Sequence, residues 1–265
     1  MLITATRPIY SPMSKNVGTL ILFDLVSTIT DAGPRYAQAY LDISEQYNLP
    51  APTKRAILNE LGQRTLKEII DIHSPGLAAD KIPAFMQDCN SACDAMLNDA
   101  SWVEQLFPDV KETLTELQAQ GYRLGLYTGT RKEAAVDQLR YHQLETIFPD
   151  GMIRAKDNIT DEGKNSETIK LEQIGSLIRD NPAKHIVVVG DSVTDYHAAR
   201  NNGASFIGFA NTPKDVFHFA NAGVTAVFTR YERLAGLIKT ALNENAPGNS
   251  NAAPAVTTAR NHKHP

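Results

Sequence analysis

The sequence predicts an α/β protein, in which a doubly wound parallel sheet carries an inserted, all-helical subdomain. Short, continuous apolar runs alternate with segments of helical spacing, which is the pattern of parallel strands joined by helical crossovers. One long stretch near the N-terminus breaks this alternation and contains helical patterns only. Because 42% of the 265 residues are hydrophobic, the chain can bury a sizeable core, which excludes global disorder.

Five apolar runs are the expected strands. Leu20–Phe23 is uninterrupted and ends at Asp24, which is typical of a strand buried on both faces. The other candidates are Tyr122–Tyr127, Ile186–Val189, Ser205–Phe209 and Thr225–Phe228. Right-handed crossovers place the carboxyl ends of such strands along one edge of the sheet, where ligands bind in doubly wound folds.

Helices fill the segments between these strands. Val110, Leu114 and Leu117 follow the i, i+4, i+7 spacing of one helix face and precede a stop at Gly121. A second apolar stripe, which ends before Asn181-Pro182, consists of Leu171, Ile174 and Ile178. These segments provide the crossovers that a parallel sheet needs.

The insertion covers residues 32–105 and contains no convincing strand. Short segments that contain Pro and Gly divide it into four helical stretches, at 34–47, 53–61, 64–72 and 80–97. We expect it to form a cap over the carboxyl edge of the sheet. The core then comprises 19–31 and 106–242, preceded by a flexible N-terminus (1–18) and followed by an Asn/Ala/Pro-rich disordered tail (243–265).

Composition excludes several classes of function. A net charge of −4 argues against nucleic-acid binding, which usually needs a basic patch. No run approaches the ~18 apolar residues of a membrane span. Residues 1–15 lack the apolar region of a signal peptide, and the only cysteines, Cys89 and Cys93, suit small buried thiols on one helix face. We therefore expect a cytoplasmic protein; the sequence does not indicate its oligomeric state.

Polar residues gather at three of the predicted strand ends. They are Asp24, Thr28, Thr128, Asp191 and Asp195, and Lys164 precedes a helix from which it could join them. Carboxylates that meet at one sheet edge repel each other unless a hard cation such as Mg²⁺ lies among them. With hydroxyl groups and an ammonium group added, the set suits a phosphoryl group.

Four segments in this order resemble the motifs of the haloacid dehalogenase (HAD) superfamily. Phe23–Asp31 is similar to the first motif, Leu126–Gly129 to the second, Gly163-Lys164 to the third and Gly190–Asp195 to the fourth. The helical insertion is placed like the C1-type cap of that superfamily, and Phe107–Val110 resembles the phosphoglycolate phosphatase-like branch. The resemblance covers about residues 19–230 and implies a Rossmann-like core.

The resemblance also implies a role for each matching residue. Asp24 would attack phosphorus and form an aspartyl-phosphate. Mg²⁺ would be held by Asp24, Asp191, Asp195 and the backbone carbonyl of Val26. The phosphoryl group would be bound by Thr28, Thr128, Gly129 and Lys164. The third motif is the loosest, because Asn165 follows Lys164 where the family usually has proline, and Lys156 competes for the role.

Val26 departs from the phosphatase pattern. That branch places a second aspartate two residues after the first, where it protonates the leaving oxygen and then activates water; Ser27 likewise replaces the usual glycine. Loss of a general acid/base typically costs 10²–10⁴-fold in rate. Related members work without this aspartate: dehalogenases carry tyrosine there, phosphonoacetaldehyde hydrolases alanine and P-type ATPases threonine. Val26 is therefore compatible with catalysis by this fold but argues against ordinary phosphomonoester hydrolysis.

The leading interpretation is an Mg²⁺-dependent, phosphatase-like hydrolase acting on a small phosphorylated metabolite. One alternative is a catalytically impaired relative that binds a ligand or a protein. Another is cleavage of C–P or C–halogen bonds, for which C–P chemistry would need a cap lysine such as Lys54 or Lys67. Taken singly, Asp24, Asp191 and Asp195 could equally be turn or helix-capping residues.

Overall fold

The computed structural model describes residues 18–61, 64–97, 99, 102–157, 161 and 163–244. The expected flexible N-terminus and disordered tail lie outside these residues, apart from Gly18 and the last two residues of the final helix. Among the described residues, no helix combines the length and the apolar composition that crossing a bilayer requires.

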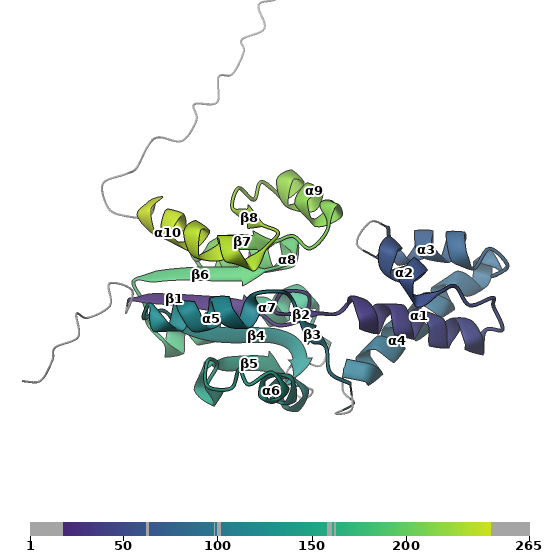
Figure 1. Cartoon of the computed structure of the whole chain (residues 1–265), viewed down its shortest axis with the longest axis horizontal. Coiled ribbons are helices and arrows are strands. Elements are labelled where there is room, and N and C mark those ends of the chain that lie inside the picture. The colour runs from purple at the N-terminus through teal and green to yellow at the C-terminus, as the bar shows by residue number, and fades with distance from the viewer. Residues whose placement is uncertain are drawn as a thin grey trace, which may run out of the picture.

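A six-stranded parallel sheet forms the centre of the molecule, as the sequence predicts (Figure 1). Its strand order is β5-β4-β1-β6-β7-β8, so the chain moves outward from β1 on one side and later returns to build the other side. The strands are β1 (Thr19–Asp24), β4 (Arg123–Arg131), β5 (Ile153–Lys156), β6 (His185–Gly190), β7 (Ser205–Phe209) and β8 (Val227–Phe228). This order places β1 between β4 and β6, at the point where a doubly wound sheet binds its ligands.

Helices cover both faces of the sheet. Ile21 and Phe23 of β1 pack on the face that carries α5 (Val110–Ala119), α6 (Lys132–Tyr141) and α10 (Leu234–Glu244). Leu20 and Leu22 pack on the opposite face, where the helices are α7 (Ser166–Asp180), α8 (Val193–Asn201) and α9 (Pro213–Ala222). Burial of alternate residues on both faces explains why β1 reads as one continuous apolar run. Short 3₁₀ turns lie at Ala79–Lys81, Asp150–Met152 and Tyr231–Arg233.

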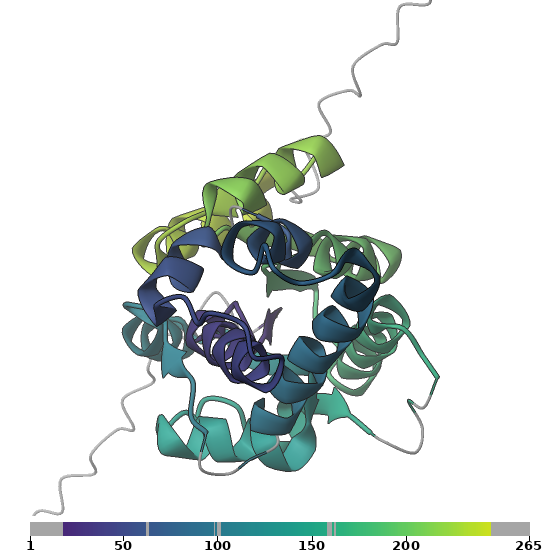
Figure 2. The same cartoon turned by 90° about the vertical axis from the view of Figure 1, so that its right-hand side faces the viewer.

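The helices of the insertion, which we call the cap, are α1 (Gly33–Gln46), α2 (Lys54–Glu60), α3 (Leu66–His73) and α4 (Ile82–Leu97). They lie beyond one end of the sheet and face the viewer in Figure 2. They share a core of their own, in which the ring of Phe85 packs edge-on against Tyr40 and Tyr47 at centroid distances of 5.5 and 5.1 Å. Cys89 and Cys93 both lie on the buried side of α4.

The two crossings between core and cap form a small antiparallel pair, β2 (Thr30–Asp31) with β3 (Gln105–Leu106). Glu104 lies buried beside this pair, where it accepts hydrogen bonds from the Thr30 hydroxyl at 2.6 Å and from Arg35 Nε at 2.7 Å. Arg35 also donates to the Cys93 carbonyl at 3.1 Å. The buried ion pair between Arg35 and Glu104 therefore connects β2 and β3 to the first and last cap helices.

Candidate active site

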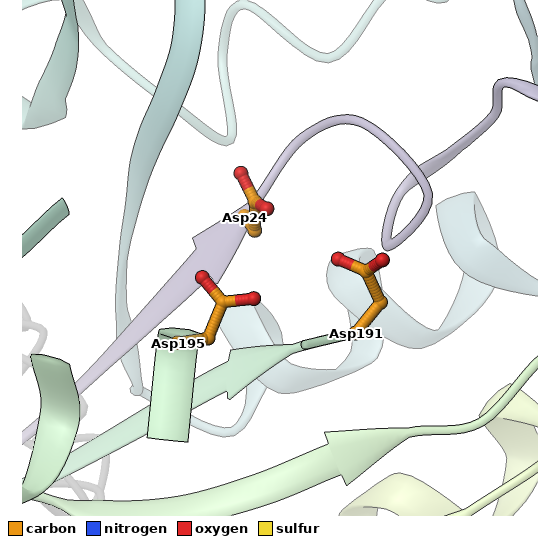
Figure 3. Close-up of side chains that lie close together, drawn as sticks. All are labelled: Asp24, Asp191 and Asp195. Atoms are coloured by element: carbon orange, nitrogen blue, oxygen red, sulfur yellow. The ribbon is translucent and has the colours of Figure 1, made fainter. Parts of the chain in front are cut away.

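Three carboxylates converge at the carboxyl edge of the sheet. Asp24 ends β1, Asp191 follows β6 directly, and Asp195 lies in the first turn of α8. Because β1 and β6 are neighbouring parallel strands, their ends bring these side chains together. One oxygen from each lies within 4.8 Å of the others, and Figure 3 shows the carboxylates directed toward a shared space. The predicted juxtaposition is present.

The ammonium group among these carboxylates belongs to Lys170. Helix α7 packs against α8 and directs Lys170 Nζ to within 2.7 Å of both Asp24 Oδ2 and Asp195 Oδ1. Lys170 is 8% exposed, so its charge is paired away from bulk water. Sequence reasoning missed this residue.

The structure does not bring Lys164 to the carboxylates, where the sequence predicts it. Its Nζ atom pairs with Asp161 at 3.3 Å and with Glu172 at 2.5 Å, and its side chain is about a third exposed. The competing candidate Lys156 is exposed at the end of β5. The physical reason is the place of each residue on its element: Lys164 precedes α7 in a loop, whereas Lys170 lies on the buried side of that helix.

Asp195 has both oxygens engaged within the protein. Its Oδ1 atom accepts hydrogen bonds from Lys170 and from the Tyr127 hydroxyl at 3.1 Å, and its Oδ2 atom accepts from the amide and hydroxyl of Ser192. Ser192 and Asp195 form a capping box at the start of α8. A side chain on Gly190 would approach Asp195 to 2.6 Å, so this packing needs glycine there. Both Asp195 oxygens are thus engaged in holding Lys170, Tyr127 and the first turn of α8.

The predicted threonines lie at the same edge. The Thr28 hydroxyl donates to Asp191 Oδ1 at 3.2 Å, and the Thr28 carbonyl accepts a hydrogen bond from the Tyr231 hydroxyl at 2.6 Å. Thr128 is fully buried one residue after Tyr127, which pairs in register with Asp24. Gln173 anchors the Thr128 carbonyl through its side-chain amide at 2.9 Å. Gly129, also predicted, follows Thr128 and is exposed.

The loop after Asp24 is tightly folded. Val26 forms a bridge with Thr30 that uses the Leu25 carbonyl and the Ser27 amide, so the Val26 carbonyl takes no part in it. The Val26 side chain packs against the core. Ser27 has a φ of 62°, in the left-handed region that glycine adopts most easily. The loop therefore leaves the Val26 carbonyl out of this bridge and carries no titratable group at position 26.

The electrostatics indicate an excess of negative charge. Burial raises the pKa of Asp24 to about 6, although Lys170 opposes this rise. Burial and the neighbouring Asp195 also raise the pKa of Asp191 well above its usual range. Burial lowers the pKa of Lys170, but the carboxylates around it outweigh this effect and the net shift is upward. One ammonium thus faces three carboxyl groups whose negative charges burial disfavours, and a further cation would stabilise the charged forms of these groups.

A cavity of about 620 Å³ opens beside these groups, between the core and the cap. Its core lining includes Ser27 and Asp191, and its cap lining includes Tyr36 and Leu58. Neither Lys54 nor Lys67 lines it: Lys54 donates to Gln38, and Lys67 pairs with Asp71 on the cap surface. Of the three carboxylates, Asp191 lines this cavity, so a ligand bound there would contact both the edge of the carboxylate cluster and the cap.

Comparison with known proteins agrees with this geometry. Residues 21–209 match the family model of haloacid dehalogenase-like hydrolases. Phosphoglycolate phosphatase from Vibrio vulnificus is 28% identical over 196 residues, which cover 71% of this chain and 82% of that protein. Phosphoglycolate phosphatase from Aliivibrio fischeri is 26% identical and covers 69% of this chain and 80% of its own length.

Solved structures show the same fold. A haloacid dehalogenase-like family protein from Streptococcus pneumoniae superposes with a TM-score of 0.56 and 19% identity, covering 84% of this chain and 99% of its own. At these identities, the likeness establishes the fold alone.

Proposed function

Because this chain belongs to the haloacid dehalogenase-like hydrolases and is a phosphatase-like enzyme, we propose that it transfers the phosphoryl group of a small phosphate ester to Asp24 and then to water. The observation that carries this proposal is the shared Lys170 ammonium, held at 2.7 Å from Asp24 with Asp191 beside them. A carboxylate that is buried, paired with a lysine and next to a carboxylate that lines the cavity suits a nucleophile for an anionic phosphoryl group.

The residues present fit a magnesium ion. Asp24 and Asp191 offer carboxylate oxygens, and the Val26 carbonyl lies on the same loop and is not used in its bridge. Hard oxygen ligands of this kind are those that Mg²⁺ prefers. Bound there, Mg²⁺ would screen the charge between the carboxylate and the anionic substrate. We assign Asp195 to positioning Lys170, because its oxygens already accept four hydrogen bonds.

We assign each residue of the site a role in phosphoryl transfer. Asp24 attacks phosphorus and displaces the alcohol oxygen, forming an aspartyl-phosphate. Lys170 keeps the Asp24 carboxylate oriented and neutralises charge that develops on the phosphoryl oxygens. The hydroxyls of Thr28 and Thr128 bind the same oxygens, and the Gln173 contact holds the Thr128 backbone in place.

Val26 determines how well the reaction proceeds. A valine side chain neither protonates the leaving oxygen nor activates the water that cleaves the aspartyl-phosphate. We therefore propose a phosphatase that favours esters with good leaving groups and releases phosphate slowly from its covalent form. C–P cleavage is disfavoured because neither candidate cap lysine lines the cavity.

Phosphate release tests this function. The wild-type protein and the Val26→Asp variant are compared on alkyl and aryl phosphates, with Mg²⁺ and with a chelator. We expect Mg²⁺-dependent release by the wild type from aryl esters, and a gain of 10²-fold or more on alkyl esters in the variant. If neither protein released phosphate from any ester, the result would contradict the proposal and favour a binding protein.

A further inference from the structure

The cap side of the cavity is apolar. Tyr36 on α1 and Leu58 on α2 line it together with Leu61 at the end of α2. Tyr36 is 40% exposed and Leu58 is 37% exposed, so both belong to the few large hydrophobic side chains that are solvent-exposed in the described part of the chain. Two such side chains on one cavity wall provide a surface that an apolar part of a ligand would cover.

The core side of the cavity is acidic. Besides Asp191, it contains Asp31 just before α1 and Asp215 in the first turn of α9. Asp31 Oδ1 accepts a hydrogen bond from the Gly33 amide at 2.9 Å, and Asp215 Oδ2 accepts from the amide and hydroxyl of Thr212 at 2.8 Å each. All of these donors are uncharged, so neither carboxylate is neutralised by a cation at these hydrogen bonds.

No cation offsets these charges at the cavity wall. The remaining lining residues, Ser27, Gly33, Asn211 and Thr212, are uncharged, so the described lining contains no lysine, arginine or histidine. Within the described residues, neither Asp31 nor Asp215 forms an ion pair. The Lys170 ammonium is committed to Asp24 and Asp195 at the phosphoryl end.

We infer that the cavity selects phosphate esters whose organic part is uncharged and partly apolar, and that it rejects organic parts bearing a carboxylate. This inference rests on the proposed function, since it assumes that the phosphoryl group binds at Asp24. The apolar part of the ester packs on Tyr36 and Leu58, whereas a carboxylate there meets Asp31 and Asp215 with no cation to pair with. Phosphoglycolate, whose organic part is a carboxylate, is therefore a poor substrate here, although the Vibrio relative is a phosphoglycolate phosphatase.

A pair of unreactive ligands tests this selection without turnover. In the first, a CH₂ group replaces the ester oxygen of phosphoglycolate; the second is its carboxamide, which has the same shape without the carboxylate charge. Dissociation constants are measured by calorimetry with Mg²⁺ for the wild type and for Asp31→Asn. Asp71→Asn is the matched control, because Asp71 is a cap aspartate that pairs with Lys67 away from this cavity.

We expect the wild type to bind the carboxamide at least tenfold more tightly than the carboxylate. In Asp31→Asn, this ratio of the two dissociation constants should be smaller by threefold or more. The control variant keeps the wild-type ratio, and Leu58→Asn weakens binding of propylphosphonate more than that of methylphosphonate. Equal or tighter binding of the carboxylate would overturn the inference while leaving the proposed function intact. Binding of neither ligand, nor of inorganic phosphate, would overturn both.

Discussion

Replacing Lys170 with methionine removes the ammonium that Asp24 and Asp195 share and keeps the length of the side chain. Two contacts of 2.7 Å are lost in a site that is almost closed to water. Removing one partner of a buried ion pair costs about 3–5 kcal/mol, because a charge remains buried without compensation. We expect the free energy of unfolding to fall by this amount in metal-free buffer.

The same change removes a positive group from the phosphoryl site. Loss of one preorganised donor costs about 10²–10³-fold in kcat, and we expect at least that loss for Lys170→Met. Urea unfolding and Mg²⁺-dependent phosphate release from an aryl ester measure the two effects separately, since activity is assayed in the folded variant.

Lys164→Met is the matched control. Its ammonium forms exposed pairs with Asp161 and Glu172, and such pairs contribute about 0–1 kcal/mol. We expect near wild-type stability and activity in this variant. If Lys164→Met abolished activity while Lys170→Met retained it, the assignment of Lys170 would be refuted.

Three further predictions follow from local geometry. Ser27→Gly should stabilise the protein by about 1 kcal/mol in thermal unfolding, because the left-handed backbone conformation at this positive φ costs a residue with a side chain roughly 1–2 kcal/mol. A loss of stability in this variant would contradict that reasoning. Glu104→Ala should lower the free energy of unfolding in urea by about 3–5 kcal/mol, because it leaves Arg35 buried without its partner. A loss under about 1 kcal/mol would show that this ion pair contributes little to stability. Burial raises the pKa of Cys89 to about 12 and that of Cys93 to about 11, which lowers the fraction of each thiol that is ionised at pH 8. Because the thiolate is the reactive form, iodoacetamide should label the native protein far more slowly than the unfolded chain. Equal labelling rates would contradict this.

Much of the core could be read from sequence because its strands are buried on both faces. Leu20–Phe23 and Ile186–Val189 are continuous apolar runs, and the aspartate one or two residues beyond each run marks the sheet edge. Asp24 and Asp191 could therefore be placed together before the fold was known. β5 could not be predicted, because Ile153–Lys156 contains a single large apolar residue and lies at the edge of the sheet.

Lys170 was harder to predict because its role depends on tertiary packing. The spacing of Leu171, Ile174 and Ile178 indicates one apolar face for α7, and these three residues do pack against the core. The structure also buries Lys170 on this helix, which the apolar spacing does not indicate. A lysine on the buried side of a helix needs a charged partner, so its position at i−4 from a core isoleucine was the available signal.

The central claim is that Asp24 accepts a phosphoryl group. Wild-type protein is mixed with an aryl phosphate and Mg²⁺, quenched in acid within milliseconds to seconds, and analysed by mass spectrometry of the peptide containing Asp24. Because Val26 leaves the second step without a general base, we predict a phosphorylated Asp24 that accumulates in the wild type, is less abundant in Val26→Asp and is absent in Asp24→Asn. Mg²⁺-dependent phosphate release that persists in Asp24→Asn, with no phosphorylated peptide, would contradict the claim.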